Sequence, residues 1–217
     1  MKKAENGRPA PHAAGEGLLI VVSGPSGSGK GTVLARLLSQ REGLYYSVSA
    51  TTRAPRPGER DGKDYYFLSR EEFLRRVEGG RMLEHAEYCG NFYGTPRDAV
   101  EENSRKGLDT ILEIEVQGAK QVQKASPGCV SVFIVPPCAE ELERRLRGRG
   151  TESEDVIRKR LKASIRELEL AGDYDYIVVN DTVEAAAARL DAILTAEKCR
   201  AARLTRGEWY PRGCDKV

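Results

Sequence analysis

A glycine-rich run near the start of the chain has the composition of a phosphate-binding loop. It reads Gly24-Pro25-Ser26-Gly27-Ser28-Gly29-Lys30-Gly31-Thr32. Glycines let successive main-chain N–H groups point toward one anion, and Lys30 adds a mobile positive charge for the terminal phosphates. A simple turn between two elements would need neither the four glycines nor the lysine. We therefore predict that this run binds the phosphates of a nucleotide.

The elements on either side of the loop support this prediction. Residues 18–22 are a continuous apolar run, which is typical of a strand buried on both faces, and residues 33–38 carry apolar side chains at helical spacing. A helix that begins at the loop adds the positive end of its dipole to the anion site. Gly31, rather than Ser or Thr, follows the lysine. The order Gly-Lys-Gly-Thr therefore resembles the nucleoside monophosphate kinases more than GTPases or motor ATPases.

A second group of residues combines arginines with tyrosines. Arg53 and Arg56 lie in a loop that two prolines stiffen, and Tyr65 and Tyr93 lie in β-rich stretches further along. Paired guanidinium groups suit a phosphate monoester, and a rigid loop lowers the entropy lost on binding. Either residue type alone would more often be a solvated arginine or a packed tyrosine. Their occurrence together in one segment predicts a second phosphate site.

The elements that must position these groups alternate along the chain. Strand and helix patterns predict an α/β fold, in which helices cover both faces of a mainly parallel sheet and ligands bind at the carboxyl ends of its strands. Thr95 and Pro96 read as the cap and first residue of one such helix. The expected segments are a flexible extension (1–16), a core (17–46 and 96–203), a small β-rich insertion (47–95), a mobile lid within the core (138–155) and a tail (204–217).

The composition limits the classes of protein to consider. The chain has 35 Lys and Arg against 33 Asp and Glu, so a net charge of +2 gives no reason to expect nucleic acid or a membrane as a partner. Its five cysteines lack Cys-x-x-Cys spacing, which favours reduced thiols over disulfides or a zinc site. No apolar run is long enough to span a membrane, and the first residues lack an apolar signal core. We expect a cytoplasmic protein, and the oligomeric state stays open.

Several ordered stretches of the sequence closely resemble the guanylate kinase family. Beside the glycine loop they comprise residues 49–59, 61–65, 90–95, 111–118, 147–152 and 178–181. The resemblance covers nearly all of residues 17–200. It implies a P-loop NTPase-like core with a GMP-binding insertion at 47–95, and transfer of a phosphoryl group from ATP, with Mg²⁺, to GMP or dGMP.

The resemblance also implies binding residues for each nucleotide. ATP would be held by residues 24–32 and by Asn180 near its adenine. GMP would be held by Ser49, Arg53, Arg56, Tyr65, Glu84, Tyr93, Thr95 and Glu113. Guanine offers a ring N–H beside an exocyclic amine, and a carboxylate accepts both, whereas adenine has an acceptor at the ring position. The resemblance gives this base-recognising role to Glu84 and Glu113.

Catalysis would rest on cations rather than on a nucleophile. The resemblance selects Lys30, Arg53, Arg145, Arg149 and Arg160, which would neutralise charge on the equatorial oxygens of the transferring phosphoryl group. It gives no direct metal ligand, and Thr32 and Glu115 are outer-shell candidates. The family commonly has Asp at the position of Glu115, so this chain departs from the pattern there.

Two other functions compete with this interpretation. A kinase for another monophosphate, such as AMP or UMP, would not need the acceptor carboxylates of Glu84 and Glu113. A non-catalytic guanylate-kinase-like protein-binding module would typically have lost the glycine loop and the arginines, which are intact here.

Overall fold

The computed structural model describes residues 16–88, 90–148 and 154–204. Its larger sheet has five strands, all paired in parallel, in the spatial order β2-β7-β1-β8-β9. These strands are β1 (Leu19–Ser23), β2 (Leu44–Tyr46), β7 (Asp109–Glu113), β8 (Val130–Val135) and β9 (Tyr176–Val179). Every residue of β1 is buried, as its central place in a doubly covered sheet requires.

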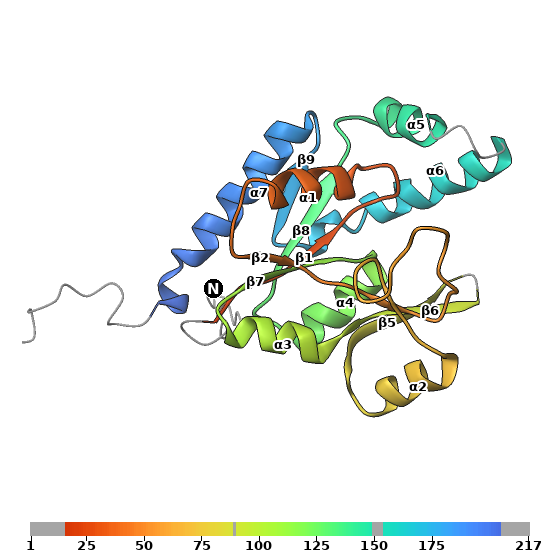
Figure 1. Ribbon diagram of the computed structural model, residues 1–217. Coiled ribbons are helices and arrows are strands. Elements are labelled where there is room, and N and C mark those ends of the chain that lie inside the picture. The colour runs from red at the N-terminus through yellow and green to blue at the C-terminus, as the bar shows by residue number, and fades with distance from the viewer. Residues whose placement is uncertain (1–15, 89, 149–153, 205–217) are drawn as a thin grey trace, which may run out of the picture.

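Helices cover both faces of this sheet (Figure 1). One face packs against α1 (Lys30–Leu38) and α7 (Val183–Lys198), with Ile20 and Val22 pointing into that layer. The other face packs against α3 (Arg97–Arg105) and α4 (Val116–Ala125), with Leu19 and Val21 pointing there. The alternation of side chains along one buried strand thus serves two separate cores.

A smaller sheet is inserted between β2 and α3. Its strand order is β4-β3-β6-β5, with β3 (Ala50–Thr51), β4 (Tyr66–Phe67), β5 (Met82–Tyr88) and β6 (Asn91–Pro96). The pair β3–β4 is parallel, and the other two pairs are antiparallel. Helix α2 (Arg70–Glu78), which Ser69 caps, buries Phe73 against this sheet. The predicted α/β class, with helices on both faces and a small β-rich insertion, is confirmed.

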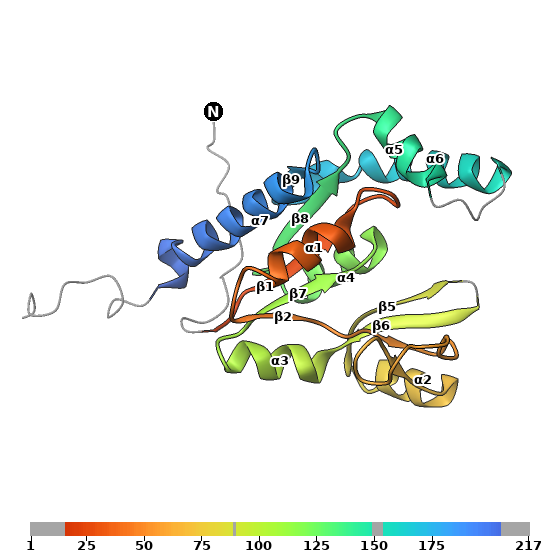
Figure 2. The same cartoon turned by 45° about the horizontal axis from the view of Figure 1, so that its top comes forward.

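The remaining helices lie beyond the carboxyl ends of the large sheet. Helices α5 (Ala139–Arg147) and α6 (Glu154–Leu168) pack on each other through a small apolar cluster of their own. In Figure 2 they lie on one side of α1 while the small sheet lies on the other side. Two short 3-10 helices, Ala171–Asp173 and Ala201–Arg203, complete the described chain. The start of α1 therefore lies between two substructures that could each carry a ligand.

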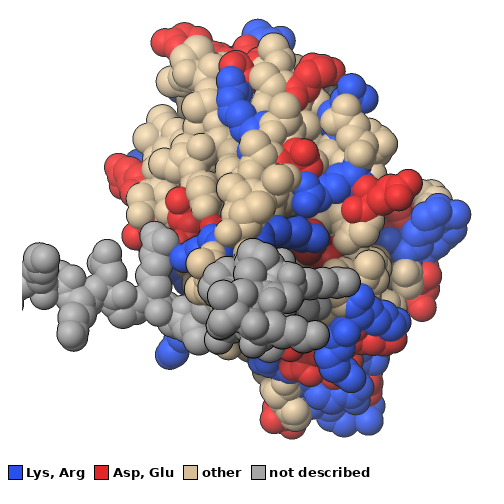
Figure 3. Space-filling model, turned by 90° about the vertical axis from the view of Figure 1, so that its left-hand side faces the viewer, with Lys and Arg blue, Asp and Glu red and all other residues tan. Residues whose placement is uncertain are grey.

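Charges of both signs share the face of the molecule seen in Figure 3. This mixture matches the near balance of acidic and basic residues in the whole chain. Among the residues that the structure describes, we find no helix with the length and apolar character needed to cross a lipid bilayer.

Candidate active site

The glycine loop connects β1 to α1, and its backbone requires glycine at Gly29. That residue caps α1 with a φ of 85°, a conformation that other residues seldom adopt. A Cβ atom there would also lie 2.4 Å from Nδ2 of Asn180. The Asn180 amide and the guanidinium of Arg145 both donate to the carbonyl of Ser28, at 2.7 and 3.2 Å. Asn180, which follows β9, and Arg145, which lies on α5, therefore hold the backbone of the loop in place.

Lys30 lies at the first position of α1 and points back along the loop. Its Nζ donates to the carbonyls of Gly24 and Pro25 at 2.6 and 3.2 Å. The same lysine lines a cavity of about 590 Å³ in front of the loop, together with Glu115 and Glu167. A cavity of this size in front of a cationic loop can hold a polyphosphate.

Helix α6 contacts the loop at Ser26. Arg160 donates to the hydroxyl of Ser26 at 2.5 Å, and Ser164 donates to its carbonyl at 3.2 Å. Arg145 on α5 also pairs with Glu141 at 2.6 Å. The structure thus brings Lys30, Arg145 and Arg160 to one loop. Arg149, and residues 149–153 of the predicted lid, lie outside the described residues.

The second phosphate site expected from the sequence gathers in the small sheet. Arg53 donates to Glu59 at 2.9 Å, and the other oxygen of Glu59 accepts the main-chain N–H of Arg56 at 2.7 Å. The guanidinium of Arg53 lies over the ring of Tyr65, 5.4 Å from its centre, and Tyr65 meets Tyr93 edge to face. Arg53, Tyr65 and Tyr93 therefore meet in one region, and Glu59 holds the backbone of Arg56 beside it.

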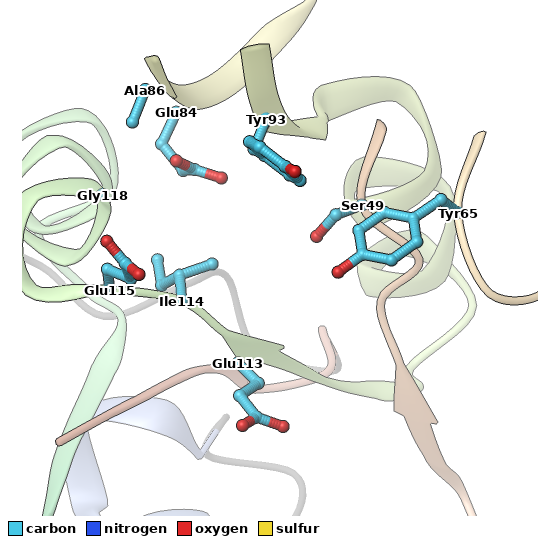
Figure 4. A pocket seen from close by; sticks show the side chains of 10 residues that line it. Ser49, Tyr65, Glu84, Ala86, Tyr93, Glu113, Ile114, Glu115 and Gly118 are labelled. Atoms are coloured by element: carbon cyan, nitrogen blue, oxygen red, sulfur yellow. The ribbon is translucent and has the colours of Figure 1, made fainter. Parts of the chain in front are cut away.

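A cavity of about 290 Å³ extends from this region toward the core (Figure 4). Ser49, Tyr65 and Tyr93 line one part of it, and Glu84 lies at the far end. Glu84 is only 6% exposed, and one of its oxygens accepts the hydroxyl of Thr95 at 2.8 Å. Burial raises the pKa of the Glu84 carboxyl, and the nearby negative charge of Glu115 adds to this effect. The cavity can therefore offer a carboxylate acceptor in a largely dry setting.

The two acidic residues after β7 point to different places. The Glu113 carboxylate accepts the hydroxyl of Tyr46 at 2.9 Å, and its oxygens lie 3.7 and 3.9 Å from where a Cβ on Gly31 would be. Glu113 therefore faces the start of α1. Glu115, in contrast, lies at the Glu84 end of the cavity (Figure 4). Both residues line both cavities, so the two cavities meet at this turn.

Side chains with oxygen ligands lie near the loop, but the described residues do not form a complete set of metal ligands. Within residues 16–88, 90–148 and 154–204, no group of three acidic, histidine or cysteine side chains could hold a metal ion. Thr32 on α1 is exposed beside Gly31, which Glu113 faces. A metal bound here would be held mainly through water and ligand oxygens, as Mg²⁺ prefers.

Sequence reasoning missed some residues of this site and misread one. The sequence gives no sign that Glu59 holds Arg53 or that Tyr46 donates to Glu113, because only the folded chain brings these side chains together. The capping role predicted for Thr95 was wrong: α3 begins at Arg97 with Pro96 as its cap, and the Thr95 hydroxyl bonds to Glu84 instead.

Comparisons with known proteins give one consistent result. The family model described as guanylate kinase matches residues 16–197. A guanylate kinase of Desulfitobacterium hafniense (strain Y51) is 58% identical over 187 residues, which is 86% of this chain and 94% of that protein. One of Shouchella clausii (strain KSM-K16) is 52% identical over 191 residues, covering 88% and 93%. The crystal structure of guanylate kinase from Anaplasma phagocytophilum matches with a TM-score of 0.71 at 42% identity, covering 88% and 91%.

Proposed function

Because the chain belongs to the guanylate kinase family and is therefore an ATP:GMP phosphotransferase, we propose that phosphoryl transfer takes place where its two cavities meet. ATP occupies the 590 Å³ cavity with its phosphates on the glycine loop. GMP, or dGMP, occupies the 290 Å³ cavity of the small sheet. The observation that carries this proposal is the shared boundary of the cavities, formed by Ser49, Tyr65, Glu113, Ile114 and Glu115.

We propose that the guanine base lies against Glu84, with Glu115 as the second carboxylate. The placement of Glu115 at the Glu84 end of the cavity supports this pairing. Ser49 and Thr95 remain as further polar partners, of which Thr95 acts through its bond to Glu84. The family resemblance gives Glu113 a role at the base, but Glu113 faces Gly31. We propose that it lies near the phosphates of ATP instead. Two carboxylates match the two hydrogen-bond donors of guanine. They would disfavour adenine, whose ring nitrogen is an acceptor at the position of the guanine ring N–H.

The GMP phosphate would lie between Arg53, Arg56, Tyr65 and Tyr93. Glu59 holds the guanidinium of Arg53 and the backbone of Arg56 in one geometry, so little conformational entropy is lost when the phosphate binds. Lys30 would move from its two loop carbonyls to the phosphates of ATP. Arg145, Arg149 and Arg160 would neutralise the transferring group as the lid at 138–155 closes and excludes water.

The residues present also fit Mg²⁺ as the cofactor that accompanies ATP. The Thr32 hydroxyl and the carboxylates of Glu113 and Glu115 are hard oxygen donors, and Glu113 faces the start of α1 where the phosphates would lie. We propose that Thr32 and Glu113 hold the water shell of the ion, because Glu115 lies at the Glu84 end of the cavity and is assigned to the base above. When bound, Mg²⁺ supplies positive charge to the phosphates of ATP. For Asn180 we propose a supporting role, since its buried amide donates to the loop carbonyl of Ser28.

A panel of acceptors tests the assignment of substrate. Purified protein is given ATP and Mg²⁺ with GMP, dGMP, AMP or UMP, and ADP release is followed. We expect rapid turnover with GMP and slower turnover with dGMP, while AMP and UMP give at most traces. Faster turnover with AMP or UMP than with GMP would reject the guanine assignment, and folded protein without any acceptor-dependent ADP release would favour a binding module.

We further propose a cytoplasmic location for this reaction.

A further inference from the structure

One side chain of helix α4, in the core, forms two hydrogen bonds with strand β5 of the small sheet. The amide oxygen of Gln121 accepts the main-chain N–H of His85 at 3.1 Å, and the amide nitrogen donates to the carbonyl of the same residue at 2.8 Å. A side-chain amide that pairs with both groups of one residue replaces the partner strand that this stretch would otherwise need. His85 directly follows Glu84, so this pair fixes the backbone that carries the base-recognising carboxylate.

One helical turn earlier, the same face of α4 presents Gly118. A Cβ atom at this buried position would lie 2.6 Å from Oε2 of Glu84, and 3.2 Å from its carboxyl carbon. Gly118 is helical and its φ is not in the left-handed region, so nothing in the backbone conformation requires glycine. Alanine would ordinarily be the better helix former. The advantage of glycine here is therefore space for the Glu84 carboxylate.

We propose that Gly118 and Gln121 are positioning residues that set the preference for guanine by fixing Glu84. Gln121 fixes the backbone position of the strand that carries Glu84. Gly118 leaves room for the Oε2 atom of Glu84, while the Oε1 atom accepts a hydrogen bond from Thr95. The proposal rests on the guanine base occupying the Glu84 cavity, as proposed above. It adds that a helix of the core decides where the acceptor oxygens of Glu84 lie.

An alanine at position 118 should change the function of the protein rather than its stability. The atom nearest to an added Cβ at Gly118 is the far end of a flexible side chain, which can rotate away without moving the backbone. The carboxylate would then leave the position at which it accepts from guanine. A purely structural glycine would instead affect all substrates alike.

Comparing GMP with IMP measures the placement of the carboxylate directly. IMP keeps the ring N–H of GMP but lacks the exocyclic amine, so the ratio of kcat/KM values for the two substrates reports the second hydrogen bond. We expect Gly118→Ala and Gln121→Ala each to lower this ratio about tenfold. The KM for ATP should stay unchanged. The matched control is Gln123→Ala on the same helix, whose amide donates to the carbonyl of Asp173 at 3.1 Å, and its ratio should equal that of the unaltered protein.

A Glu84→Gln variant separates failure of this inference from failure of the base assignment. If Glu84→Gln leaves the GMP to IMP ratio unchanged, the base does not bind at Glu84 and both proposals fall. If Glu84→Gln lowers the ratio while Gly118→Ala and Gln121→Ala lower both kcat/KM values equally, only the positioning role is refuted. Combining Gly118→Ala with Glu84→Asp gives a further test, because the shorter carboxylate should relieve the clash. Simple additivity of the two losses would contradict the steric coupling.

Discussion

Replacing Glu84 by glutamine should make the protein more stable and less active at the same time. Glu84 is only 6% exposed, so its charge has lost most of its contact with water. The hydrogen bond that Thr95 donates does not offset this loss, and the pKa of the Glu84 carboxyl is therefore raised. Glutamine keeps an oxygen that can accept from Thr95 but carries no charge. Removing the buried charge should add about 1 kcal/mol to the free energy of unfolding at neutral pH. For a chain of 217 residues this corresponds to a rise in Tm of roughly 2–4 °C.

The gain in stability should depend on pH with a defined sign. A carboxyl group whose pKa is raised by folding binds its proton more tightly in the folded protein. Its contribution to stability is therefore fully present below the pKa of the unfolded chain and is lost as the pH rises through the folded value. The Tm difference between Glu84→Gln and the unaltered protein should be largest at neutral pH and shrink as the pH falls toward about 4.3, the ordinary glutamate value.

Activity should move in the opposite direction. If the glutamine oxygen accepts from Thr95, its amide N–H₂ replaces the other carboxylate oxygen and places a donor against a donor of guanine, so a hydrogen bond to a charged group is lost, worth about 1.5–3 kcal/mol. We expect kcat/KM for GMP to fall roughly 10- to 150-fold. Thermal unfolding across a pH series and steady-state kinetics measure the two effects. The control is Glu87→Gln, an exposed carboxylate on the same strand, which should change neither. A less stable Glu84→Gln variant with unchanged GMP turnover would refute the reasoning.

Three further substitutions test other parts of the site. Lys30→Ala should lower kcat by about 10²–10³ with little change in Tm, because its two contacts to loop carbonyls are local, and normal turnover would remove Lys30 from the reaction. Arg53→Lys should raise the KM for GMP about tenfold and spare the KM for ATP, since an ammonium cannot serve Glu59 and a phosphate in the same fork geometry; equal effects on both substrates would argue against a GMP-specific role. Gly29→Ala should lower the free energy of unfolding by about 1–3 kcal/mol, as its φ of 85° and the 2.4 Å approach to Asn180 both oppose a Cβ atom, and calorimetry showing no loss would contradict this.

Glu113 and Glu115 show where sequence reasoning stops. Two residues apart in a strand, their side chains would share one face, and nothing in the sequence separates them. In the structure β7 ends at Glu113 and α4 begins at Val116, so the chain turns between the two carboxylates. This turn directs Glu113 toward Gly31 and Glu115 toward Glu84. Which acid faces the glycine loop and which faces Glu84 therefore depends on where a strand ends, to within a single residue.

Those parts of the protein that depend on local physics can be read from the amino-acid sequence. An apolar run, four glycines with a lysine and a helical apolar pattern are enough for a strand, a phosphate loop and a helix, because each depends on neighbours along the chain. The contacts between side chains of distant elements depend instead on how the whole chain folds. Nothing local in the sequence indicates what Gly118 and Gln121 adjoin, since the Glu84 carboxylate and the His85 backbone lie on a strand more than thirty residues earlier. Contacts of that range follow from how the small sheet packs on the core.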